Sequence, residues 1–99
     1  MAALDLLGRR WSLRVLWELR DGPVGARMLR ERCDAMSPSV LYQRLGELTE
    51  AELITQDVDQ RYELTELGRS LGAALEPLDR WSRRWATRTS VKSPRRGEI

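Results

Sequence analysis

The stretch MSPSVLYQRLGELTEAEL (Met36 to Leu53) decides how the rest of the chain is interpreted. Ser37 followed by proline predicts the start of a helix, because serine commonly caps a helix and proline has no amide that needs a partner. Leucines then recur at every third or fourth position, which predicts one buried face. The opposite face begins with short or planar hydrogen-bonding side chains, at Ser39, Tyr42 and Gln43. Such a surface is suited to reading the edges of bases.

The composition is typical of one small globular domain. The chain has 99 residues, of which 41% are hydrophobic and 32% charged, with a net charge of +2. No apolar run approaches the roughly 20 residues of a membrane span, and the N-terminus lacks the basic start of a signal peptide. We therefore expect a soluble, cytoplasmic protein that does not enter a membrane.

Catalytic and metal sites are not indicated. The chain has no histidine and a single cysteine, Cys33, which excludes an internal disulfide and the usual structural zinc sites. It also lacks a glycine-rich phosphate loop, and its carboxylates are spread along the chain. We expect no metal, no cofactor and no enzymatic activity. Cys33 follows an apolar pattern and is interpreted as a small buried hydrophobic residue.

The order of the predicted elements defines the fold class. We predict helices over residues 3–7, 11–19, 26–33 and 38–51, a short strand at Val24, an antiparallel hairpin over 54–64, and a long helix capped by Thr65. Short helices joined by a tight connection to a helix that opens with Ser-Pro are typical of a helix-turn-helix, and the hairpin is its wing. The fold class is mainly α with a small β-hairpin, a winged helix-turn-helix domain over residues 1–88.

Two helices have more apolar surface than one small core can cover. The helix over 11–19 is apolar around most of its circumference, and the last helix carries a coiled-coil-like seam. The seam consists of Leu67, Leu71, Leu75, Leu78, Trp81 and Trp85. We predict a homodimer in which the first and last helices form the interface. Pro77 predicts a kink or a split of the last helix near Glu76.

Basic residues gather at the end of the chain. Seven of them lie between Arg80 and Arg96 with no acidic residue among them, whereas acidic residues crowd the middle of the chain. Residues 89–99 are predicted to form a basic tail without fixed structure. The tail either contacts DNA or only keeps the protein in solution, and no sequence feature decides between these two roles.

The candidate DNA contacts combine the polar face of the helix over 38–51 with the nearby arginines. They are Ser37, Ser39, Tyr42, Gln43, Arg44, Arg27, Arg30 and Arg61. Gln43 suits a bidentate contact with adenine. Arg27 and Arg30 are candidates for phosphate contacts, and Arg61 is the one basic residue of the wing. Arg44 is expected either to brace the domain or to contact a phosphate.

Four tryptophans form a second group of candidate residues. They are Trp11, Trp17, Trp81 and Trp85. Aromatic residues at helical spacing are usually buried in a core or an interface, so a dimer interface is the simpler interpretation. The alternative is a pocket for a flat small-molecule effector of unknown identity, formed where the tryptophans of two copies meet.

Three blocks of sequence resemble the bacterial HxlR-type transcriptional regulators. The blocks are GRRWSLRVLWELRDGP (Gly8 to Pro23), SPSVLYQRLGELTEAELI (Ser37 to Ile54) and YELTELGRSL (Tyr62 to Leu71). The resemblance implies a homodimer that binds double-stranded DNA, with the third helix of the motif in the major groove and the hairpin on the backbone or minor groove.

The chain also departs from this family at several positions. Ser39 and Gly46 stand where family members commonly have basic residues, Glu52 replaces a glycine, and the wing is short. The family's cysteine ahead of the first helix is missing. These departures keep a second hypothesis open, that the protein is a winged-helix module for a small molecule or a protein partner, with weakened DNA binding.

Overall fold

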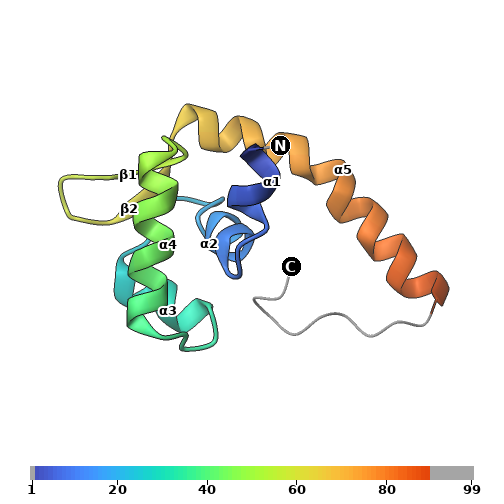
Figure 1. The fold of residues 1–99 in the computed structure, drawn as a ribbon, viewed down its shortest axis with the longest axis horizontal. Coiled ribbons are helices and arrows are strands. Elements are labelled where there is room, and N and C mark those ends of the chain that lie inside the picture. The colour runs from blue at the N-terminus through green and yellow to red at the C-terminus, as the bar shows by residue number, and fades with distance from the viewer. Residues whose placement is uncertain (1, 90–99) are drawn as a thin grey trace.

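The structure is a computed structural model that describes residues 2–89. The described part measures 45 × 27 × 25 Å along its principal axes (Figure 1). Its elements follow the predicted order. They are α1 (Ala2–Leu7), α2 (Ser12–Glu18), α3 (Ala26–Arg32), α4 (Pro38–Glu50), β1 (Ile54–Gln56), β2 (Tyr62–Leu64) and α5 (Glu66–Thr89). The predicted class, a mainly helical winged helix-turn-helix, is confirmed.

One hydrophobic core lies between α2, α3, α4 and the base of the hairpin. The three leucines that were predicted to face inward from α4 are each at most 1% exposed. The core consists of Val15, Leu16, Leu19, Val24, Leu29, Cys33, Met36, Leu41, Leu45, Leu48, Leu53, Ile54 and Leu64. Cys33 is thus the small buried residue that the pattern predicted. This packing fixes α4 along one face and leaves its other face outward.

The turn between α3 and α4 brings the chain to the start of α4. Asp34 and Ala35 both adopt left-handed backbone angles, with φ of 58° and 54°. Pro38 is the first residue of α4, as predicted, but the predicted cap is wrong in detail. The Ser37 hydroxyl makes no hydrogen bond to a helix amide and instead lies 2.9 Å from the Ser39 hydroxyl. Both hydroxyls therefore sit together at the outer end of the helix.

The hairpin has the predicted place and pairing. β1 and β2 are antiparallel, with Ile54 opposite Leu64 and Gln56 opposite Tyr62. Val24 exchanges two backbone hydrogen bonds with Tyr62, at 2.9 and 2.8 Å, which confirms the short strand predicted there. This bridge ties the loop before α3 to the wing.

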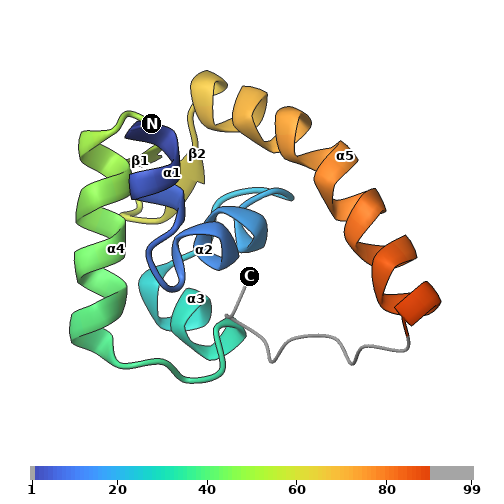
Figure 2. The same cartoon turned by 45° about the vertical axis from the view of Figure 1, so that its right-hand side comes forward.

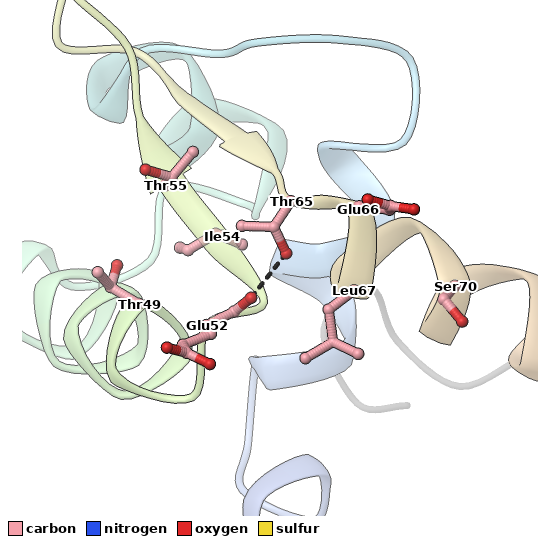
Figure 3. Close-up of a pocket in the computed structure, with 8 residues that line it drawn as sticks. All are labelled: Thr49, Glu52, Ile54, Thr55, Thr65, Glu66, Leu67 and Ser70. Carbon is pink, nitrogen blue, oxygen red and sulfur yellow. Dashed lines mark hydrogen bonds between the residues drawn. The ribbon is translucent and has the colours of Figure 1, made fainter.

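A close junction joins the end of α4 to the start of α5. Glu52 has a φ of 64°, so a non-glycine residue occupies a left-handed position. The Thr65 hydroxyl donates to the Glu52 carbonyl at 2.6 Å (Figure 3). It also accepts from the Gly68 amide at 3.0 Å, which confirms Thr65 as a cap. A β-carbon on Gly68 would lie 2.1 Å from the Leu53 carbonyl oxygen. Only glycine fits at this position.

α5 settles one alternative left open by its prediction and differs from the prediction at its end. A kink or a split was predicted near Glu76. The helix continues through Pro77 as one element, so it does not split, and its ribbon bends along its length (Figures 1 and 2). The second half of this exposed helix has room to curve away from the proline ring. Thr89, assigned to the tail, is still helical. The rest of the predicted tail, residues 90–99, lies outside the described residues.

Candidate nucleic-acid interface

The outer face of α4 presents neutral polar side chains. Ser39, Tyr42 and Gln43 are exposed, and Tyr42 retains 56% of its surface accessible. Gly46 is exposed one turn further along the helix, and nothing lies within 4 Å of the β-carbon it lacks. Because the buried leucines hold the inner face, this outer face keeps a fixed orientation. A rigid helix with accessible amide and hydroxyl groups has the chemistry needed to read base edges.

The two candidate arginines of α3 differ in environment. Arg27 is exposed. Arg30 is half-buried, and its Nε donates to the Met36 carbonyl at 2.6 Å, across the turn of the motif. Arg30 therefore holds the backbone just before α4, whereas the guanidinium of Arg27 extends into solvent.

Arg44 belongs to a small ion-pair network. Its side chain is 13% exposed, and its Nη1 donates to Glu47 Oε1, one turn further along α4. Arg9, from the segment between α1 and α2, donates from Nη1 to the other carboxylate oxygen of Glu47 at 3.0 Å. This geometry favours the bracing role for Arg44. Glu47 links α4 to the N-terminal segment, a connection that sequence analysis missed.

Arg61 of the wing is paired with acidic neighbours. Its Nε donates to Asp57 Oδ2 at 3.0 Å, and its Nη2 lies 3.6 Å from Asp59 Oδ2. The other oxygen of Asp57 accepts the backbone amides of Asp59 and Arg61, both at 2.9 Å. The Arg61 amide and these further bonds hold the pKa of the Asp57 carboxyl below its usual value. The wing is therefore a closed loop in which two carboxylates offset one arginine.

The four tryptophans do not form one cluster within a single chain. Trp11 packs partly against the core, with the Arg10 guanidinium 5.3 Å from its ring. Trp17 is 41% exposed. Among the described residues, the one stacked aromatic pair is Trp81 and Trp85 on α5, with ring centroids 6.0 Å apart and planes within 6°.

Arg14 is a second residue that sequence analysis missed. It forms an ion pair with Glu18 at 2.7 Å, and its Nη2 donates to the Arg32 carbonyl at 3.0 Å. Arg14 and Glu18 are four residues apart on a predicted helix, so their spacing was a usable signal. The bond to Arg32 connects α2 to the end of α3, which stabilises the motif that carries α4.

Residues 2–89 offer little for other chemistry. They contain no group of three or more cysteine, aspartate or glutamate side chains arranged to hold a metal ion. None of their helices has both the length and the apolar character that crossing a bilayer requires.

The fold and this surface define a helix-turn-helix protein with a wing. The sequence profile of the HxlR-like helix-turn-helix family matches residues 6–90. The chain therefore belongs to this family and is a transcriptional regulator of the helix-turn-helix type. The regulators found among its relatives agree with the expectation of a non-enzyme.

Two similar proteins come from Bacillus subtilis strain 168. The HTH-type transcriptional regulator YodB is 31% identical over 87 residues, covering 82% of this chain and 78% of YodB. The uncharacterized HTH-type transcriptional regulator YvaP is 27% identical over 89 residues, covering 84% of this chain and 82% of YvaP.

Solved structures show the same fold. The quinone-bound structure of YodB from B. subtilis superposes with a TM-score of 0.78 at 32% identity, covering 84% of this chain and 93% of that one. A putative transcriptional regulator of the MarR family from Enterococcus faecalis V583 superposes with a TM-score of 0.79 at 26% identity, covering 90% of this chain and 86% of that one.

Proposed function

We propose that this regulator binds specific DNA sequences as a homodimer, with the N-terminal half of α4 in the major groove and the hairpin over 54–64 as the wing. The observation that carries the proposal is the exposed face of Ser39, Tyr42 and Gln43 on a helix whose other face is locked into the core. Uncharged hydrogen-bonding groups in a fixed position discriminate bases, whereas flexible charged groups contact any phosphate.

The proposed contacts fall into two groups. Gln43 pairs with an adenine edge, and Tyr42 and Ser39 contact neighbouring bases or phosphates. Arg27 contacts phosphate, since it is exposed beside the turn. Arg30 and Arg44 chiefly fix the orientation of α4, because Arg30 bonds to the Met36 carbonyl and Arg44 bonds to Glu47. The exposed hydroxyl of Ser37, beside that of Ser39, contacts a phosphate. Arg61 adds a phosphate contact only if DNA displaces Asp57 and Asp59, which lowers the contribution expected from the wing.

The homodimer is supported by apolar side chains that one chain leaves uncovered. They lie on α1 and α5 and comprise Leu4, Leu67, Leu78, Trp81 and Trp85. Monomeric proteins rarely expose so many large apolar residues on neighbouring elements. A two-fold dimer through these helices would present two copies of α4 to successive major grooves, about 34 Å apart. The proposed binding to DNA requires that the protein act in the bacterial cytoplasm, where the chromosome lies.

A second candidate function is the binding of a flat aromatic effector. It is favoured by the exposed ring of Trp17 and the stacked, exposed rings of Trp81 and Trp85. The relative YodB has a quinone-bound structure, and a quinone is also a flat ring compound. Tryptophan emission measured during titration with quinones and other planar compounds tests this function. Emission that no compound changes would contradict it.

Random-site selection with the purified protein tests the main proposal. We expect enriched sequences whose binding weakens steeply as salt rises, because phosphate contacts release bound counterions. The absence of any enriched sequence at low salt would contradict the proposal.

Gly46→Arg tests the orientation proposed for α4. This change places a cation on the exposed face of α4 at a position without steric obstruction. We expect about tenfold tighter binding at low salt, and a salt dependence steeper by about one phosphate contact. Gly46→Ala is the matched control, because it changes helix propensity without adding charge. Fluorescence anisotropy with an enriched site measures both variants, and equal affinities would place this face away from DNA.

A further inference from the structure

α5 carries an uncovered apolar stripe along its length. Leu67 and Leu78 are each 55% exposed, Trp81 is 51% exposed and Trp85 is 41% exposed. At 3.6 residues per turn these four side chains share one side of the helix. The second half of α5 stands clear of the rest of the described chain (Figures 1 and 2). No other part of residues 2–89 can cover this part of the stripe.

The N-terminal end of the stripe, at Leu67, borders a surface hollow that also contains two glutamates. The hollow measures about 740 Å³ and lies between the end of α4, β1 and the start of α5 (Figure 3). It is lined by Thr49, Glu52, Ile54, Thr55, Thr65, Glu66, Leu67 and Ser70. Glu52 and Glu66 are exposed, and neither carboxylate is in an ion pair with another of the described residues. The hollow thus combines an apolar wall at Leu67 with two unneutralised negative charges.

The other end of the stripe carries unpaired positive charge. Arg80 and Arg83, on the far side of α5, form ion pairs with Glu76 and Asp79 at 2.8 and 3.1 Å. Arg84 and Arg88 lie on the side that borders Trp85, and the described residues provide no ion pair for either. α5 therefore has an acidic hollow at its start and two uncompensated arginines at its end, both beside the same stripe.

We propose that a second copy of this chain packs its α5 antiparallel along the stripe, so that its Trp85 enters the hollow and its Arg84 and Arg88 pair with Glu66 and Glu52. This inference rests on the homodimer of the proposed function and adds the register of the two helices. Leu67 and Trp85 are 18 residues apart, about 27 Å along a helix. Centring the contact near Glu76 therefore places each Leu67 opposite the other copy's Trp85.

Electrostatics favours this antiparallel register over a parallel one. A parallel pair would place arginines against arginines at one end and carboxylates against carboxylates at the other. The antiparallel pair also aligns the two helix dipoles favourably. Two-fold symmetry repeats the contact, so one dimer contains two filled hollows. The two carboxylates of the hollow would then favour a partner chain whose α5 has a basic end.

A charge-swap experiment tests the register directly. One variant carries Glu52→Arg and Glu66→Arg, and the other carries Arg84→Glu and Arg88→Glu. Each variant alone would place like charges together at both hollows, so we expect its dimer dissociation constant to rise roughly 100-fold. A mixture of the two variants has opposite charges at both hollows. It should form a heterodimer of nearly wild-type affinity in sedimentation velocity.

Controls separate this inference from the proposed function. A swap on the far face of α5, Glu76→Arg with Arg80→Glu, changes as many charges and should leave dimerisation unchanged. A chain with all four substitutions should homodimerise again, which excludes misfolding as the cause of the losses. A monomeric wild type would contradict the proposed homodimer. A dimeric wild type whose two variants neither weaken alone nor recover on mixing would overturn only the antiparallel register.

Discussion

Large apolar side chains are buried in the winged-helix body but exposed on the second half of α5. In the body, Leu29, Leu41 and Leu48 are at most 1% exposed, and Cys33 lies fully buried among them. On α5, Leu78, Trp81 and Trp85 follow an equally regular helical spacing and remain largely exposed. The body completes its core within one chain, whereas the second half of α5 leaves its apolar side chains exposed, which is the basis of the proposed dimer.

The difference shows what a hydrophobic period can and cannot predict. A repeat of three and four residues predicts a helix with one apolar face, because side chains at those intervals lie above one another. It does not say whether that face meets the same chain or a second copy. The close contact at Gly68 holds the start of α5 against the winged-helix body. The part of the apolar repeat nearest this contact can be covered by the same chain, and the part beyond it cannot.

Gly68→Ala should have the largest effect, because it separates the two regions. The added methyl group would lie 2.1 Å from the Leu53 carbonyl oxygen, so the start of α5 must shift away from the body. We expect the free energy of unfolding to fall by about 3 kcal/mol and Tm by roughly 15 °C. Gly72→Ala is the matched control on the same helix. Nothing lies within 4 Å of its added carbon, so it should raise stability by about 0.5 kcal/mol in thermal melts. Equal effects of the two changes would contradict the tight junction.

The double change Trp81→Ser and Trp85→Ser tests whether the exposed second half of α5, called the free half below, forms the dimer interface. Both rings are exposed in one chain, so their removal should leave the fold intact and dissociate the dimer, with a dissociation constant at least about 100-fold higher. Sedimentation equilibrium measures the association, and circular dichroism shows whether the helices remain. Arg80→Ser combined with Arg83→Ser, on the far side of the same half of α5, is the matched control and should leave the dimer intact. If the double variant stayed dimeric at micromolar concentration, the free half would not be the interface.

The alkylation rate of the Cys33 thiol tests whether reagents in solvent can reach the core of the winged-helix body. Burial raises the pKa of the Cys33 thiol above its usual value, so less thiolate is present at any given pH than in the unfolded chain. We expect alkylation by iodoacetamide at pH 8 to be on the order of 1000-fold slower in the folded protein than in denaturant. Raising the pH from 8 to 9 should increase the rate by a larger factor in the folded state than in denaturant, because the thiol with the higher pKa is further from full ionisation. Rapid labelling of the native protein by mass spectrometry would contradict the closed core.

Much of the fold could be predicted from local sequence. The Ser-Pro start of α4, its inward leucines, the short hairpin and the Thr65 cap each depend on residues within a few positions of one another. The errors arose where competing contacts exist. The Ser37 hydroxyl found Ser39 instead of a helix amide. At Pro77 the prediction left a kink and a split open, and α5 continues through the proline because the exposed second half is free to curve.

The candidate site was predictable in its outline but not in its electrostatics. Spacing alone placed Tyr42 and Gln43 on the outer face, since α4 has a single inner row of leucines. The pairing of Arg9 with Glu47 joins residues 38 positions apart, and no local pattern indicates it. The hydrogen-bond partners of Arg30 and Arg61 were likewise not predicted. The sequence therefore suggested that both guanidinium groups were free to contact phosphate, whereas in the structure they bond to the Met36 carbonyl and to Asp57.

The most direct test of the account is the binding of a selected two-half-site DNA whose half-sites are moved apart by five base pairs. Five base pairs are about half a helical turn, so the insertion turns one half-site to the opposite side of the duplex. A dimer held by two α5 helices cannot follow this rotation, and we predict that affinity falls to that of an isolated half-site. Unchanged affinity after the insertion would contradict a rigid dimer with two recognition helices in successive major grooves.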